Sequence, residues 1–159
     1  MAHANIKSRV DLFREEGNTI ATINGCFDLL HVGHLHMLYL ASKQADILIV
    51  MLNSDASVKK YKGQSRPIHL LEERMQMIAA LEFVDFVTVF EESTPNAVLE
   101  IIRPDVHVNS VEYGENCIEA PVVKKHGGKI ALIPFIEGFS STSIVEKIKQ
   151  SEATSATNS

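Results

Sequence analysis

The chain has 159 residues, of which 45% are hydrophobic and 22% are charged, and its formal net charge is −5. A chain of this length can bury about 70% of its unfolded surface in one domain, so it needs no disulfides or metal ions to be stable. The acidic balance argues against a nucleic-acid coat protein or a membrane-surface protein. The two cysteines, Cys26 and Cys117, have neither CxxC nor zinc-knuckle spacing, which fits a reducing compartment.

The sequence is not expected to contain a targeting segment or a membrane span. The first twenty residues are charged throughout, and no later stretch approaches the roughly eighteen uninterrupted apolar residues of a membrane helix. We therefore expect a soluble, cytoplasmic protein. The last residues, SEATSATNS, are small and polar, which is typical of disorder. The sequence thus predicts one domain over residues 1–150 and a disordered polar tail over residues 151–159.

Five short apolar segments are predicted to be β-strands. In chain order they are residues 19–25, 46–54, 83–90, 105–109 and 129–135. Residues 47–52 are apolar at every position, which is typical of a parallel strand with both faces covered by helices.

Helical patterns alternate with these strands. They cover residues 33–45, 70–81, 95–102, 118–126 and about 142–150. Thr94 before Pro95 is expected to cap one helix, and Gly127-Gly128 is expected to end another. Alternating strands and helices with right-handed crossovers predict an α/β, Rossmann-like, doubly wound fold. The expected domain is a five-stranded parallel sheet with helices on both faces.

Residues 24–34, NGCFDLLHVGH, follow the first predicted strand and lead into a helix. In a doubly wound sheet, ligands bind outside the carboxyl ends of the strands at the topological switch point. We therefore expect a ligand at this segment. His31 and His34 lie on one side of the first helical turn, beside free backbone N–H groups and the positive end of the helix dipole. Gly33 would let a ligand approach without a Cβ in the way.

This arrangement predicts a phosphate site, but two alternatives remain. The segment has neither GxxxxGK[ST] nor GxGxxG, which disfavours a P-loop NTPase or an NAD enzyme. The histidines can instead be polar caps of an amphipathic helix. Zinc bound by His31, His34 and His36 is disfavoured, because His36 points off the shared face and tetrahedral zinc needs further ligands. We assign no metal ligands to the protein. The histidines that stand alone are expected on the surface or in the core: His3, His69, His107 and His126.

At these residues the chain resembles a known superfamily. NGCFDLLHVGHL is similar to the HxGH signature of the nucleotidyltransferases. Residues 53–75, NSDASVKKYKGQSRPIHLLEERM, resemble the adenylyltransferase module that activates heptose 1-phosphate in lipopolysaccharide precursor synthesis. The similarity covers about residues 22–148. HxGH alone indicates transfer of a nucleotidyl group, whereas its combination with NSDAS, KGxSRP and ExRM is far more specific.

The resemblance implies an enzyme that transfers AMP from ATP to a sugar 1-phosphate, with Mg²⁺ bound to ATP, in a homodimer. It implies that His31, His34 and Lys59 are catalytic, with Lys59 and Lys62 holding phosphates on the loop after the second strand. The nucleotide-binding residues that it implies are Asn24, Gly25, Cys26, Phe27, Asp28, Gly33, Lys62, Arg74, Ser140, Ser141 and Thr142. The substrate-binding residues that it implies are Asp28, Arg66, Asn109, Glu112 and Tyr113.

Several of these residues also have a plain structural interpretation. The lysines at positions 59, 60 and 62 can form a solvated basic loop. Arg74 can form an ion pair on a helix surface. The serines and threonine at positions 140–142 can cap a helix.

The chain departs from the resemblance after the fourth strand. Where the heptose enzymes carry a segment like VKGGDY, this chain has VNSVEY at residues 108–113. This segment is expected to face the sugar phosphate or the base, so three functions stay open. They are the sugar-phosphate adenylyltransferase, a CTP-dependent cytidylyltransferase acting on a small polyol or alcohol phosphate such as glycerol 3-phosphate, and a nucleotide-binding protein that has lost catalysis.

Overall fold

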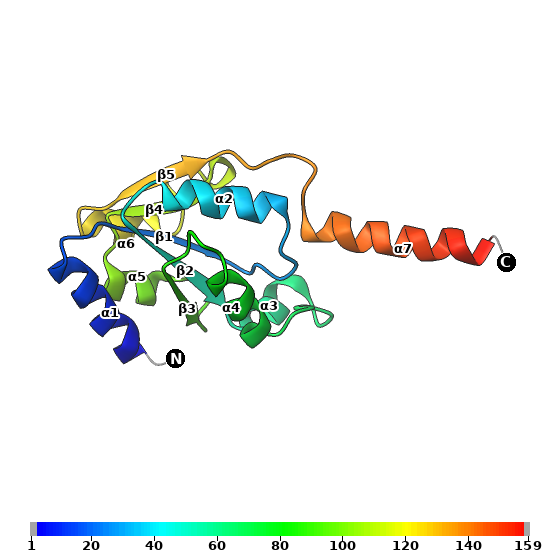
Figure 1. Cartoon of the computed structure of the whole chain (residues 1–159), viewed down its shortest axis with the longest axis horizontal. Coiled ribbons are helices and arrows are strands. Elements are labelled where there is room, and N and C mark those ends of the chain that lie inside the picture. Colours follow the sequence, from blue (N-terminus) through cyan, green and yellow to red (C-terminus); the bar gives the residue numbers. More distant parts are fainter. Residues whose placement is uncertain (1–2, 158–159) are drawn as a thin grey trace.

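Five parallel strands form a single sheet in the order β3-β2-β1-β4-β5 in the computed structural model, which describes residues 3–157 (Figure 1). The strands are β1 (Ile20–Gly25), β2 (Ile47–Asn53), β3 (Phe86–Phe90), β4 (Val106–Ser110) and β5 (Lys129–Ile133). The order reverses at β1, which pairs with β2 on one side and β4 on the other. This switch point is where ligands bind in such sheets. The predicted five-stranded, doubly wound parallel sheet is confirmed.

Helices cover both faces of the sheet (Figure 1). On one face, α2 (Val32–Ser42) and α4 (Leu71–Ala79) pack against side chains of β1, β2 and β4. On the other face lie α1 (His3–Glu15), α5 (Asn96–Ile102) and α6 (Ala120–Lys125). The short helix α3 (Asp55–Lys62) follows β2, and the 3-10 turn η1 (Val111–Tyr113) follows β4. Both therefore stand at the carboxyl edge of the sheet.

Alternate residues of β1, β2, β3 and β5 contribute to two separate hydrophobic cores, one on each face of the sheet. Ala21 and Ile23 of β1 pack under α2, whereas Ile20 packs under α1 and α5. A buried polar pair interrupts the second face, where the hydroxyl of Thr22 lies 2.8 Å from Nδ1 of His107. The alternation places Asn24, at the end of β1, on this second face.

Two helices of the structure are not predicted from the sequence, α1 and α3. In α3 the hydroxyl of Ser54 caps the first turn by accepting the N–H of Ser57 at 3.2 Å, and the helix ends at Gly63, which has φ +95°. Lys59 and Lys62 therefore lie on a helix, and the expectation that they lie on a loop is wrong. The cap of α5 also differs, because Pro95 and not Thr94 occupies the N-cap position.

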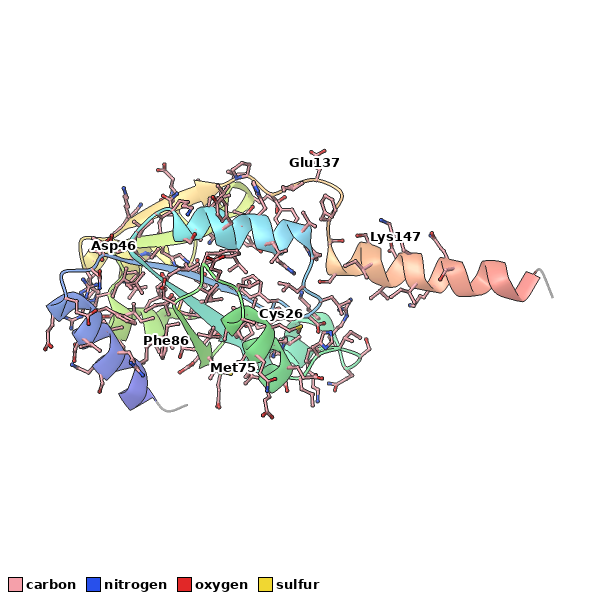
Figure 2. All side chains as sticks on the ribbon, viewed as in Figure 1. Cys26, Asp46, Met75, Phe86, Glu137 and Lys147 are labelled. Atoms are coloured by element: carbon pink, nitrogen blue, oxygen red, sulfur yellow. The ribbon has the colours of Figure 1, made fainter. Side chains whose placement is uncertain are left out.

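The last helix, α7 (Ser141–Thr157), projects beyond the sheet, and Figure 2 shows Lys147 on it well away from the strands. The helix continues to Thr157, where the sequence predicts a disordered tail. No glycine or proline interrupts this segment after Ser141, and its alanines favour helix. Residues 158–159 of the predicted tail lie outside the described residues. Over residues 3–157, no helix combines the length and the apolar character needed to cross a membrane.

Candidate functional site

The turn after β1 is held by close packing. Phe27 adopts a left-handed backbone conformation with φ 47° and folds its ring back over Gly25. A Cβ on Gly25 would stand 2.9 Å from the Phe27 ring, which is closer than carbon atoms pack, so a larger residue here would displace that ring. The turn leads directly to the first residues of α2.

His31 caps α2. Its Nδ1 accepts the backbone N–H of His34 at 3.4 Å. The two imidazole rings stack with their centroids 3.8 Å apart, and the Phe27 ring meets His34 edge-on at 5.2 Å. Because Nδ1 of His31 is an acceptor, its Nε2 carries the proton when the ring is neutral and can donate to a ligand. The capping role and a ligand-binding role therefore use different nitrogens of His31.

Both histidines are neutral at pH 7 in the ligand-free protein. Burial, together with the charges of His31 and Lys62, lowers the pKa of His34 to about 4. Burial also lowers the pKa of His31. A bound phosphate would raise both pKa values, because an opposite charge stabilises the protonated ring. The fixed positive charge at this place comes from Lys62 and from the N-terminus of α2.

Asp28 connects the turn to residues 66–69. Its buried carboxylate accepts hydrogen bonds from Arg66 Nη1 at 2.7 Å, from the N–H of Ile68 at 2.7 Å and from the N–H of His69 at 3.0 Å. Burial alone would raise the pKa of Asp28, but these hydrogen bonds hold it below its usual value. Arg66 is thus already engaged in an ion pair within the protein.

Arg74 is completely buried. Its guanidinium donates to the carbonyl oxygens of Cys26 at 2.7 Å, Asn53 at 2.9 Å and His69 at 3.1 Å, and it pairs with the carboxylate of Asp55 at 2.7 Å. The ion pair expected as its structural role is present, but it lies inside the protein and not on a helix surface. Arg74 joins the ends of β1 and β2 to α3 and α4.

A first cavity of about 230 Å³ opens at the carboxyl edge of the sheet, on the side of α2. Its apolar walls include Met37 and Phe135, and Ser110 also lines it. The cavity brings together eleven of the predicted site residues: Asn24, Gly25, Cys26, Phe27, Asp28, His34, Lys62, Asn109, Glu112, Tyr113 and Ser141. His31 stands close by, with its ring centroid 6.5 Å from that of Phe135.

The remaining predicted residues do not line this cavity: His31, Gly33, Lys59, Arg66, Arg74, Ser140 and Thr142. The space beside Gly33 is filled by the protein itself. A Cβ there would stand 3.0 Å from Cε1 of His31 and 3.2 Å from Cβ of Phe139. Gly33 therefore permits close packing of side chains, where the sequence suggested room for a ligand.

The serines at the start of α7 have the capping role considered for them, and one of them also lines the first cavity. The hydroxyl of Ser140 accepts the N–H of Ser143 at 3.0 Å, which is a helix cap. Ser141 lines the first cavity, and its hydroxyl donates to the carbonyl oxygen of Leu29 at 3.4 Å. The start of α7 is thereby attached to the loop that precedes α2.

A second cavity, of about 520 Å³, lies on the side of α3 and α6. It is contiguous with the first, because six residues line both: Asn24, Gly25, Cys26, Lys62, Asn109 and Tyr113. Its own lining residues are Asn53, Val58, Tyr61, Ser93, Ile118 and Glu119. The sequence interpretation missed Asn53 and Glu119, although asparagines at the ends of three predicted strands were a visible signal.

Metal ligands do not gather in the described part of the chain. Within residues 3–157, no group of three or more His, Cys, Asp or Glu side chains is arranged to hold a metal ion. His31 and His34 instead stack on each other, a geometry that turns the ring faces and not the nitrogens toward one another.

Comparison with known proteins identifies similar sequences over most of the chain. A family model described as cytidylyltransferase-like matches residues 22–147. A protein named "Bifunctional protein HldE" from Hahella chejuensis is 42% identical over 153 residues, which cover 96% of this chain and 32% of the relative. The protein of the same name from Pseudomonas paraeruginosa is 46% identical over 138 residues, which cover 86% of this chain and 29% of that relative. The chain thus spans about a third of the length of the curated relatives it matches. The match confirms the superfamily expected from the HxGH segment.

Two solved structures share the fold. The lipopolysaccharide core biosynthesis protein from Thermoplasma volcanium superimposes with a TM-score of 0.59 at 24% identity, over 75% of this chain and 97% of that chain. The pantoate-beta-alanine ligase from Francisella tularensis gives a TM-score of 0.52 at 16% identity, over 80% of this chain and 64% of that chain. At these identities the likeness concerns the fold alone.

Proposed function

Because the chain belongs to the cytidylyltransferase-like family, we propose that it is a nucleotidyltransferase that moves AMP from ATP onto a sugar 1-phosphate, with heptose 1-phosphate as the first candidate. The motifs NSDAS, KGxSRP and ExRM support this choice through their resemblance to the heptose 1-phosphate adenylyltransferase module. The similarity to HldE proteins extends this support over nearly the whole chain.

The observation that carries the proposal is the meeting of two cavities at the loop after β1. We assign ATP to the first cavity, where Met37 and Phe135 offer apolar surfaces for the base and His34 and Ser141 offer polar groups for phosphates. We assign the sugar phosphate to the second cavity. Lys62 lines both, so its ammonium group can neutralise phosphates of both substrates.

The reaction needs position and charge more than it needs a reactive side chain. A phosphate oxygen of the sugar 1-phosphate attacks the α-phosphorus of ATP and forms the new P–O bond. The bond from that phosphorus to the bridging oxygen breaks, and pyrophosphate leaves with the electron pair. Holding the two phosphates in line and stabilising the developing negative charge are effects that proteins achieve with fixed donors and cations. His31, His34 and Lys62 are suited to this role.

Two predicted phosphate ligands take modified roles in this proposal. Lys59 is three residues before Lys62 and on the same side of α3, so it can reach a phosphate that extends beyond the cavities. Arg74 acts indirectly, because its donors hold the loop after β1 and the end of β2. The two residues can therefore be distinguished experimentally, one by substrate affinity and the other by stability.

We propose that Mg²⁺ enters the site with ATP. Magnesium prefers phosphate oxygens and water and needs few protein ligands, which fits a site without a carboxylate cluster. Asp28, a buried carboxylate that lines the first cavity together with His34, is already bonded to Arg66 and two backbone N–H groups. When bound, the ion supplies charge neutralisation on the triphosphate. The N–H and ammonium donors of the site would bind the phosphate oxygens that the ion leaves free, because such donors do not coordinate a cation.

We also propose that the protein is a homodimer. β3 is an edge strand, and an apolar hollow beside it is lined by Met75, Ala79, Val84 and Phe86, among others. An edge strand next to apolar surface suits contact with a second copy. Sedimentation velocity of the purified protein measures the mass directly, and a monomer at all concentrations would contradict the dimer.

The experiment that tests the function is release of pyrophosphate in the presence of Mg²⁺, with ATP and CTP each combined with heptose, hexose and glycerol phosphates. Release with ATP and one sugar 1-phosphate is the expected result. Release with CTP and glycerol 3-phosphate would replace the proposal with the cytidylyltransferase alternative. Binding of ATP without release from any pair would favour a protein that has lost catalysis.

A further inference from the structure

The second cavity contains a buried carboxylate that the proposed reaction does not use. Glu119 is only 5% exposed and lines the second cavity but not the first. It occupies the N-cap position of α6, yet among the described residues its side chain makes no capping hydrogen bond to that helix. Its Oε2 accepts a hydrogen bond from Nδ2 of Asn109 at 3.3 Å, and the thiol of Cys117 is a second hydrogen-bond partner of its side chain. A buried carboxylate has room for about four hydrogen bonds, so Glu119 retains acceptor capacity toward the cavity.

Three carboxamides line the cavity together with this carboxylate. Asn53 is the last residue of β2, and Asn24 and Asn109 are one residue before the ends of the adjacent strands β1 and β4, on the same face of the sheet. The side-chain Nδ2 of Asn53 donates to the hydroxyl of Ser57 at 3.2 Å, which leaves the side-chain oxygen Oδ1 for another donor. Groups of this kind bind hydroxyls, which both donate and accept, better than they bind apolar surface or a second phosphate.

The charges in the cavity are arranged asymmetrically. Lys62 stands where the two cavities meet, because it lines both, whereas Glu119 lines the second cavity alone. A ligand that is anionic at one end and neutral but rich in hydroxyls at the other is therefore held in one orientation. That orientation directs its phosphate toward the first cavity, where His34 lies. A second phosphate at the other end of the ligand would be repelled by Glu119.

We propose that Glu119, with Asn53 and Asn109, binds the hydroxyl groups of a sugar monophosphate and selects it against short polyol phosphates and against sugar bisphosphates. This inference rests on the proposed function, because it takes the second cavity as the sugar-phosphate site. It adds residues that determine which phosphate is accepted.

The test measures binding as well as catalysis. Calorimetry gives the Kd of wild-type protein for mannose 1-phosphate, mannose 1,6-bisphosphate, glycerol 3-phosphate and ATP, and the series is repeated with Glu119→Gln and Glu119→Ala. Loss of a charged hydrogen-bond partner of a hydroxyl weakens binding by about 10- to 100-fold. We expect this loss for mannose 1-phosphate in Glu119→Ala, a smaller loss in Glu119→Gln, and unchanged ATP binding in both.

The ratio of the Kd values for the bisphosphate and the monophosphate tests the charge of Glu119, because a purely structural role of this residue would leave the ratio unchanged. Removing the negative charge in Glu119→Gln should reduce the preference for monophosphate over bisphosphate by about 10-fold, because the repulsion is gone. Glu115→Gln is the matched control, since Glu115 is exposed on the same loop and lines neither cavity. It should leave all four Kd values unchanged. If Glu119→Ala fails to fold, Asn53→Ser provides a second test, because it removes another carboxamide from the cavity. This variant should weaken the binding of mannose 1-phosphate and leave the Kd for ATP unchanged.

The outcomes separate this inference from the proposed function. One outcome is that wild-type protein binds the sugar monophosphate most tightly, that this preference depends on Glu119, and that no pyrophosphate is released from ATP. This outcome would support the inference and contradict the proposed enzymatic activity. Pyrophosphate release that Glu119→Gln and Asn53→Ser leave unchanged for every phosphate would overturn the inference and keep the enzyme. Wild-type protein that binds glycerol 3-phosphate as tightly as mannose 1-phosphate, or binds neither, would also overturn it.

Discussion

Nδ1 of His31 accepts the backbone N–H of His34 while the two imidazole rings stack 3.8 Å apart. The first histidine thus fixes the start of α2 with one nitrogen and leaves the other for a ligand. The second histidine is positioned by the first. The two histidines therefore have different roles, because His31 caps the helix and His34 is held in place by it. Substitution of each residue can separate these roles.

Substitution of His31 should separate stability from turnover. His31→Ala removes the cap and should lower the free energy of unfolding by about 1 kcal/mol, whereas His31→Ser supplies a preferred capping hydroxyl and should retain it. Both variants should lose about 10²- to 10³-fold in turnover, the scale for removing one stabiliser of transition-state charge. Urea denaturation and pyrophosphate release measure the two effects. Recovery of turnover in His31→Ser would show that the cap alone matters.

Acid should destabilise the protein through its buried histidines. Burial lowers the pKa of His107 to about 3 and that of His34 to about 4, both below the value of about 6.5 in the unfolded chain. The unfolded state therefore binds more protons below pH 6.5. The stabilisation is complete above pH 6.5 and is lost as the pH falls toward 4, at up to about 1.4 kcal/mol per pH unit for each histidine.

The variant that tests this slope is His107→Asn. It should be less stable than wild type at pH 8, because the contact with Thr22 is weakened, but its stability should fall less between pH 6.5 and 4.5. Urea denaturation at several pH values gives the slope, and the difference should be about one proton. Asp28 changes the free energy of unfolding only below about pH 4, because its pKa in the folded protein is lowered from the usual value of an aspartate. Equal slopes in both proteins would mean that His107 does not titrate as its burial implies.

Arg74→Ala should be severely destabilising. It leaves Asp55 and three carbonyl oxygens without their partner, and removing one member of a buried ion pair costs about 3–5 kcal/mol. Asp55→Asn should cost less, because Asp55 is partly exposed and the carbonyl contacts remain. Thermal and urea unfolding give both values. A stable Arg74→Ala protein with a raised KM for ATP would instead make Arg74 a direct nucleotide ligand, as the sequence resemblance implied.

Gly33→Ala should reduce activity with little change in stability. Its Cβ would crowd the His31 ring and Phe139, so the imidazole must move. The gain in helix propensity, up to about 1 kcal/mol, offsets this crowding in the unfolding free energy. We expect turnover to fall by about 10-fold. Val32→Ala, at an exposed position on the same turn, is the control that should keep full activity.

The strands were predictable because both faces of this sheet are covered. Ile47 to Leu52 are apolar at every position, and each predicted strand overlaps an observed one. Helix α1 was not predicted, because only a narrow stripe that includes Ile6 and Val10 is buried in an otherwise charged segment. Helix α3 is polar, and its signals were the cap at Ser54 and the glycine at position 63.

The site was predictable in part, and the limit is physical. Residues contiguous with the end of β1 could be placed at the carboxyl edge, because parallel strands all end there. The side chain of Arg74 could not be placed, since an arginine that binds backbone carbonyls has the same sequence appearance as one that binds phosphate. Glu119 required the topology, because only the fold brings the start of α6 beside the ends of β1 and β2.

The helix α7 begins at Ser141, which lines the first cavity, and extends away from the sheet (Figures 1 and 2). Its 17 residues correspond to a length of about 25 Å. Because Ser141 touches both the cavity and the Leu29 carbonyl, a ligand that tilts the first turn by about 10° displaces the distal end by about 4 Å. A small rearrangement at the site would thus be magnified along the helix, and a fluorescent label at position 157, its last residue, would register it as a change in distance from the sheet.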